Sequence, residues 1–136
     1  SCARTATRWA VTSAESIELV TGFYSQAFND GEPEKAAARA LGASYIQHNP
    51  GAPDGAAAFV GYVTYMCSQF PQLQLEIRRA LADGDIVVTH SHFRRTPEDR
   101  GLAVADFWRL EDGKIVEHWD VIQEVPAEAK NTNSMF

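Results

Sequence analysis

The sequence predicts an α+β fold in which three N-terminal helices pack on a curved, mostly antiparallel sheet. Three observations lead to it. Apolar residues recur at helical spacing up to Phe70, they alternate at every second position after Pro71, and two Asp-Gly pairs lie between the alternating runs. An Asp-Gly pair between such runs is a strong hairpin signal. A chain whose helices precede a series of hairpin strands is expected to place the helices on one face of the sheet.

The first two helices carry start and stop signals. Thr12 and Glu15 form a capping box, in which the Thr side chain accepts from the backbone of the third helical residue and the Glu reaches back. Apolar residues then follow at helical spacing and predict a helix over about 13–29. The second helix, PEKAAARAL, begins at Pro33 and ends before Gly42.

The third helix is predicted over about 54–70, where apolar residues recur every three or four positions until Pro71 ends the pattern. Between the second and third helices we expect only a short extended piece, at 43–50, followed by a loop rich in Gly and Pro.

The hairpin that turns at Asp112-Gly113 brings an acid onto an apolar face. With these two residues as the loop, Leu110 pairs with Ile115 and Asp106 with Trp119, and opposed residues share a face. The face expected to meet the helices carries Asp106, Trp108, Leu110, Ile115, Glu117 and Trp119. The opposite face carries Ala105, Phe107, Arg109, Val116, His118 and Asp120, so His118 and Asp120 are discounted for catalysis.

The other hairpin turns at the Asp-Gly pair at 83–84. A two-residue loop there places His90 and His92 on the same helix-covered face as Asp106. A His-x-His pair can offer two metal ligands, and with Glu98 it partly resembles the first cupin motif. The spacing to Glu98 is too long and no second motif follows, so no metal site is expected.

Length, charge and composition limit the class of protein. A chain of 136 residues and 15.0 kDa fits a single domain over 1–136, with irregular tails expected at 1–11 and 127–136. The net charge of −6 argues against a nucleic-acid partner, and no apolar run is long enough for a membrane span. Cys2 and Cys67 provide neither a disulfide framework nor a metal spacing.

The cellular location is left open by the sequence. A cytoplasmic location is favoured, while the start at Ser1-Cys2 without Met also fits an exported or lipid-anchored chain, or a trimmed one.

Three motifs carry a resemblance to a known family. They are Tyr45-Ile-Gln-His48-Asn-Pro50, the stretch from Gly84 to His90-x-His92, and the stretch from Ala105-Asp106 through Asp112-Gly113 to Trp119-Asp120. Together they resemble the SnoaL-like branch of the nuclear transport factor 2-like superfamily, most closely its aldol-condensation-catalysing group. The resemblance implies a cone-shaped fold with a deep apolar pocket between the helices and the concave sheet face. It also implies that Asp106 acts as an acid/base beside a His of the preceding strand, which His92 matches.

The residues on this face suggest proton abstraction next to a carbonyl group. Apolar surroundings would raise the pKa of Asp106 toward the range of a general base, and His92 and His48 could donate hydrogen bonds to the enolate oxygen. Such chemistry, as in aldol-type cyclisation, condensation or isomerisation, needs no cofactor. The side chains expected to hold a small apolar substrate are His90, Trp119, Trp108, Tyr45, Phe59, Tyr62 and Phe23.

A second class of function stays open. The chain could be a non-catalytic module that binds a small apolar ligand or a partner on the same fold, with Asp106 a buried structural acid and Tyr45, Trp108 and Trp119 packing the core. His48 would then satisfy only backbone groups. In either case the outer sheet face is expected to pair two subunits in a homodimer.

Overall fold

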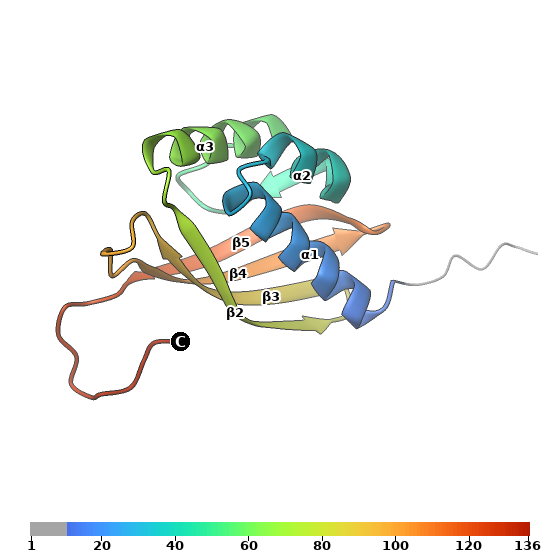
Figure 1. Cartoon of the computed structure of the whole chain (residues 1–136). Helices are drawn as coiled ribbons and strands as arrows, with labels where there is room; N and C mark the ends of the chain where they lie inside the picture. The colour runs from blue at the N-terminus through green and yellow to red at the C-terminus, as the bar shows by residue number, and fades with distance from the viewer. Residues whose placement is uncertain (1–10) are drawn as a thin grey trace, which may run out of the picture.

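The computed structural model describes residues 11–136 and has three helices on one face of a five-stranded sheet (Figure 1). The helices are α1 (Ser13–Phe28), α2 (Pro33–Ala40) and α3 (Ala56–Gln69). The strands are β1 (Leu41–Gln47), β2 (Gln74–Asp83), β3 (Ile86–Arg94), β4 (Leu102–Glu111) and β5 (Lys114–Glu124). Their order in the sheet is β1-β5-β4-β3-β2, and only β1 runs parallel to its neighbour. The predicted α+β class is confirmed.

The helix ends follow the signals in the sequence. Thr12 Oγ1 accepts a hydrogen bond of 3.1 Å from the backbone N–H of Glu15, and the capping box is complete. Pro33 opens α2, and α3 ends just before Pro71. The extended piece expected at 43–50 is β1, an edge strand that begins two residues earlier. Among residues 11–136, no helix combines the length and apolar character needed to cross a membrane.

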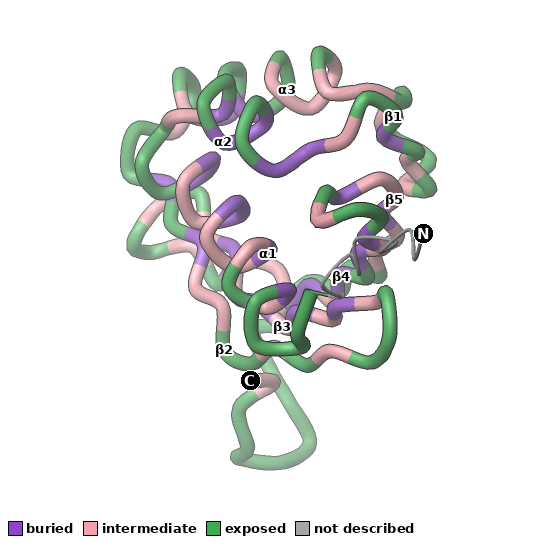
Figure 2. The backbone as a smooth tube through the Cα atoms, turned by 90° about the vertical axis from the view of Figure 1, so that its right-hand side faces the viewer, coloured by how far each residue is buried: buried purple, intermediate pink, exposed green. Residues whose placement is uncertain are grey.

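The core lies between the helices and the inner sheet face, and Figure 2 shows buried residues on α1, α2 and the strands turned toward this interior. Phe23 of α1 and Trp108 of β4 are its largest fully buried side chains, and their rings meet edge to face at 5.9 Å. The apolar side of α1 and the inner face of β4 therefore stabilise each other.

The β4–β5 hairpin begins as predicted and then changes register. Asp112 and Gly113 both take positive φ, as a two-residue turn of this kind requires, and Leu110 pairs with Ile115. A β-bulge follows: Arg109 pairs with Glu117, which leaves Val116 as the extra residue in β5.

The bulge moves every later residue of β5 to the other face of the sheet. His118 pairs with Trp108 and Asp120 with Asp106, so all four side chains share the inner face. The prediction for the inner face was right for Asp106 and Trp108 but wrong for Glu117 and Trp119, which lie on the outer face. For the same reason the face predicted for His118 and Asp120 was wrong, because both lie on the inner face.

Gly42 leaves room for the bulge. A Cβ at this position of β1 would lie only 2.8 Å from Cγ1 of Val116. Because β1 pairs with β5 at Leu41 and Ile115, the missing side chain lets the extra residue of β5 pack against the edge strand.

The β2–β3 hairpin also differs in register from the prediction. Its loop is residues 84–85, one position later than expected, and Gly84 takes the positive φ. The buried residues of β3 are Val87, Thr89, Ser91 and Phe93. His90 and His92 therefore lie on the outer face, which corrects their predicted placement, and Phe136 of the C-terminal segment stacks on both imidazoles.

Candidate active site

A cavity of about 300 Å³ lies between the inner sheet face, α1, α3 and the loop that follows β1. Its walls are mostly apolar, and the polar groups of Gln47, Asn49, His118 and Asp120 gather where the end of β1 lies beside β5. The lining residues are Tyr24, Phe28, Tyr45, Gln47, Asn49, Gly51, Ala52, Pro53, Ala58, Phe59, Tyr62, Phe93, Arg95, Leu102, Val104, Trp108, His118, Asp120 and Ile122. An apolar cavity with a few converging polar groups is the usual form of a small-molecule site.

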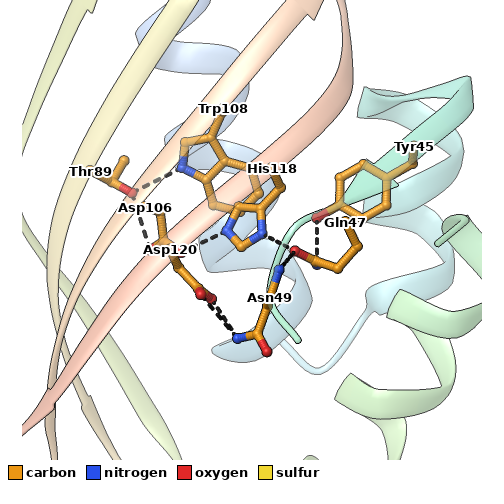
Figure 3. A network of polar contacts seen from close by, with 8 residues as sticks. All are labelled: Tyr45, Gln47, Asn49, Thr89, Asp106, Trp108, His118 and Asp120. Carbon is orange, nitrogen blue, oxygen red and sulfur yellow. Dashed lines mark hydrogen bonds and ion pairs between the residues drawn. The ribbon is translucent and has the colours of Figure 1, made fainter. Parts of the chain in front are cut away.

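Asp106 and His118 form a buried pair behind this lining (Figure 3). Asp106 Oδ1 lies 2.8 Å from His118 Nε2, and the Asp106 side chain is only 2% exposed. The hydroxyl of Thr89 donates to the other oxygen of Asp106 at 3.4 Å and accepts from the indole N–H of Trp108 at 3.0 Å. His118 lines the cavity, whereas Asp106 lies behind it.

Burial raises the pKa of the Asp106 carboxyl above its ordinary value. The hydrogen bond and charge of His118 act in the opposite direction, as does the Tyr24 hydroxyl, while the nearby negative charge of Asp120 raises the pKa further. The desolvation effect is the largest of these, so the environment favours the protonated carboxyl.

Gln47 determines which nitrogen of His118 carries a proton. The backbone N–H of Asn49 donates to Gln47 Oε1 at 3.0 Å, so the atom of Gln47 at this point must be the oxygen. His118 Nδ1 lies 2.8 Å from the same oxygen and must therefore donate to it. Because Nδ1 bears a proton, the neutral imidazole has Nε2 unprotonated and ready to share the proton of Asp106.

Asn49 holds the second carboxylate. The backbone N–H of Gly51 donates to Asn49 Oδ1 at 2.8 Å, which directs the amide nitrogen toward Asp120. That nitrogen lies 3.0 and 2.9 Å from the two carboxylate oxygens of Asp120. Asp120 is partly exposed and lines the cavity, so its remaining lone pairs are open to a ligand.

Two tyrosines bring hydroxyl groups to the same end. Burial raises the pKa of both Tyr24 and Tyr45, and the negative charge of Asp106 adds to the effect. Both phenols stay protonated at neutral pH and can donate hydrogen bonds. The Tyr45 oxygen lies 3.5 Å from the amide nitrogen of Gln47.

The structure brings five of the predicted site residues to this cavity or directly behind it: Asp106, Trp108, Tyr45, Phe59 and Tyr62. A sixth, Phe23, lies in the core behind the lining. Its ring is 4.9 Å from that of Phe59, so it supports the wall of the cavity.

Four predicted site residues lie elsewhere. His48 stacks on Trp119 with ring centroids 4.6 Å apart, and its Nε2 lies 2.7 Å from Glu117 Oε2 on the outer side. His92 Nε2 lies 2.8 Å from the carbonyl oxygen of Arg100, and His90 contacts the guanidinium of Arg79. The two-residue alternation of β3 cannot carry His90 and His92 to the cavity.

The sequence reasoning missed Tyr24, Gln47, Asn49, Arg95, His118 and Asp120 as site residues. A signal was available for His118 and Asp120, because a His-x-Asp pair shares one face of a strand whichever register holds. Because the pair lies on the strand next to that of Asp106, a register shifted by one residue would place both side chains beside Asp106. The sequence is compatible with this register as well as with the one predicted. Gln47 ends β1 and Asn49 follows two residues later, so these two residues have the same spacing.

The polar atoms of this cluster could also approach a cation. Within residues 11–136, ligand atoms of Asp106, His118 and Asp120 all lie within 4.8 Å of one another. In this structure Asp106 and His118 are hydrogen-bonded to each other and Asp120 accepts from Asn49. The atoms that could bind a cation are therefore already part of the side-chain hydrogen-bond network.

The family model of the SnoaL-like domain matches residues 20–118 of the sequence. The chain belongs to the SnoaL-like family. This match confirms the resemblance seen in the sequence motifs, and it spans the helices, the first four strands and β5 as far as His118. No protein with a curated description matches the chain.

Solved structures share the fold of this SnoaL-like chain. TsrD from Streptomyces laurentii has a TM-score of 0.68 at 21% identity, over 82% of this chain and 90% of that one. A candidate polyketide cyclase from Bacillus cereus has a TM-score of 0.68 at 23% identity, over 79% and 74% of the two chains. A candidate ketosteroid isomerase from Kribbella flavida has a TM-score of 0.68 at 18% identity, over 88% and 85%. At these identities the likeness shows the fold alone.

Proposed function

We propose that this SnoaL-like chain is an enzyme that moves a proton within a small carbonyl compound bound in the cavity. The observation that carries the proposal is the meeting of two carboxyl groups and an imidazole at one end of a mostly apolar cavity. Gln47 orients the imidazole of His118, Asn49 orients Asp120, and His118 bonds to Asp106. Environments that separate the pKa values of neighbouring carboxyl groups assign one as acid and the other as base.

Asp120 is the proposed base. Its carboxylate faces the cavity and is oriented by Asn49, whereas Asp106 is shielded from a ligand by His118. This assignment revises the sequence-based hypothesis, in which Asp106 removed the proton directly. The raised pKa of Asp106 favours a proton on the Asp106–His118 pair, and Asp120 is the carboxyl group that faces the ligand.

Tyr45 is the proposed donor to the developing enolate. Its hydroxyl is protonated at neutral pH and lines the cavity at the same end as Asp120. A donor that already points to the place where negative charge develops stabilises the transition state without reorganisation. Tyr45 takes the role that the sequence reasoning gave to His92 and His48.

The proton that leaves the substrate is returned to the product, so the reaction has no net uptake or release of protons. The α C–H bond breaks, the proton passes to Asp120, and the electron pair moves onto the carbonyl oxygen. Asp120 then returns the proton to another carbon, which is isomerisation. In the aldol case the enolate carbon first forms a bond to a second carbonyl group, and the new alkoxide takes the proton. Neither route consumes an oxidant or reductant.

Deuterium exchange tests the proposal. Cyclic and aryl ketones in D2O should exchange their α-protons faster with the wild type than with Asp120→Asn, which should lose about 10²- to 10⁴-fold. Asp83→Asn removes the same charge at the exposed end of β2 and should exchange at the wild-type rate. Equal rates for the wild type and Asp120→Asn would sink the proposed mechanism.

A ligand-binding module is the second candidate function. Both nitrogens of His118 already have partners within the protein, as in a network whose only role is structural. If ketones bind to the wild type and to Asp120→Asn with the same affinity, and neither protein accelerates exchange, this second function is the correct one.

The outer sheet face is the proposed contact between two copies of the chain. Ile86, Phe107, Trp119 and Val121 surround a shallow apolar hollow there, and Phe107 and Val121 are exposed. Light scattering should give twice the 15.0 kDa monomer mass for the wild type and the monomer mass for Val121→Glu. A monomeric wild type would overturn this contact.

A further inference from the structure

We propose that Arg95 binds a carboxylate of the substrate, so that the substrate class is a cyclic or aromatic carbonyl compound that also carries a carboxylate. The inference rests on the proposed function of the same cavity and adds the group that selects and orients the ligand.

Arg95 belongs to the cavity although it is exposed. It follows β3 directly and lines the cavity together with Phe93 and Tyr62. Its neighbour Arg94 is not part of the lining and donates to Gln74 Oε1 at 3.0 Å on the paired strand. Of two adjacent arginines, one therefore faces the ligand space and the other supports the sheet.

The guanidinium of Arg95 is held in place without using its N–H groups. It lies over the ring of Phe70, 5.8 Å from the ring centroid. Among residues 11–136 no carboxylate lies within ion-pair distance of it. The charge of Arg95 helps to lower the pKa of Asp99, but the carboxylate of Asp99 accepts from the backbone N–H groups of Arg95 at 3.0 Å and of Gly101 at 2.9 Å. All five guanidinium donors thus remain open to a ligand, in the planar arrangement that matches a carboxylate.

The charges of the cavity fix the direction of such a ligand. The chain as a whole carries a net charge of −6, and Arg95 is the one Lys or Arg among the described residues that line the cavity. A ligand carboxylate is repelled by Asp120 and attracted by Arg95. Its carbonyl group is then directed toward Asp120 and Tyr45, where the proton is removed.

Paired ligands test the inference. The probes are 4-acetylbenzoate and 3-(4-acetylphenyl)propanoate, each compared with its methyl ester in binding titrations and in α-deuterium exchange. The wild type should bind at least one acid about tenfold more tightly than its ester. Arg95→Gln should remove this preference, so that acid and ester bind with similar affinity. Arg95→Lys should keep part of the preference, and Arg94→Gln should keep all of it.

The two proposals fail separately. A preference for the acids that survives in Arg95→Gln, or no preference in the wild type for either acid, overturns the role of Arg95 even if exchange is catalysed. Loss of the preference in Arg95→Gln without any catalysed exchange supports the role of Arg95 in binding and overturns the enzyme proposal instead.

Discussion

Asp106 couples protonation to stability, because the folded chain holds the proton of this buried carboxyl more tightly than the unfolded chain does. Its pKa is raised in the folded protein from the ordinary value of 3.8, chiefly by desolvation. Between that value and the raised pKa, the folded state binds the proton and the unfolded state releases it. The stability that protonated Asp106 contributes is therefore complete below pH 3.8 and is lost as the pH rises through the folded pKa.

Asp106→Asn should remove this pH dependence, since an amide keeps the shape of the protonated acid and does not titrate. Relative to the wild type, the free energy of unfolding of the variant should improve from about pH 4 upward and level off above the pKa of Asp106 in the folded protein. Urea denaturation at several pH values measures it, with Asp83→Asn as the control for removing one charge. A difference that stays constant with pH would contradict the buried, protonated state.

A substitution at Gly42 tests whether the bulge in β5 depends on the space that β1 leaves beside Val116. Ala at this position would bring a Cβ to 2.8 Å from Val116 Cγ1, and the stiff Val side chain has little freedom to move away. Gly42→Ala should therefore cost about 1–3 kcal/mol of stability and slow the proposed exchange, because the register of His118 depends on the bulge.

Two variants check this explanation of Gly42. Gly61→Ala makes the same chemical change in α3, where a Cβ meets no other atom, and should not destabilise the chain. Adding Val116→Ala to Gly42→Ala should recover part of the lost stability, because it removes the atom that clashes. Additive effects of the two changes would show that the crowding lies elsewhere.

The elements were predictable because their signals are local. Pro33, the Thr12 capping box and the turn at Asp112-Gly113 each act within a few residues, and the structure has all three where the sequence placed them. Register is different, since it depends on atoms of other strands.

The site could be only half predicted for the same reason. The bulge at Val116 depends on space at Gly42, far away in the sequence, and one extra residue exchanges Trp119 for His118 on the inner face. Asp106 and Trp108 belong to β4, which contains no extra residue, so they lie on the face that was predicted for them.

The two faces of the sheet divide the molecule into a cavity side and an outer side. On the outer side, Phe136 stacks on His92 with ring centroids 4.2 Å apart and on His90 at 5.6 Å. The C-terminal segment thus returns to the sheet after leaving β5 (Figure 1). Since this contact lies behind the sheet, it should be independent of the cavity.

Phe136→Ala tests that independence. The NMR signals of the His90 and His92 ring protons should lose the upfield ring-current shift that a stacked phenyl ring causes, while α-proton exchange stays at the wild-type rate. Met135→Ala, which leaves the phenyl ring in place, is the matched control. Unchanged imidazole signals would show that the segment does not lie on the sheet in solution.

The proposed acid/base site depends on the Asp106–His118 pair that Gln47 orients, so the proton positions on the His118 imidazole are the first property to measure. Long-range ¹H–¹⁵N NMR correlations of the imidazole report which nitrogen is protonated. We expect a proton on Nδ1 throughout the pH range of the folded protein, with Nε2 toward Asp106. A neutral imidazole protonated mainly on Nε2, with Nδ1 bare, would contradict it.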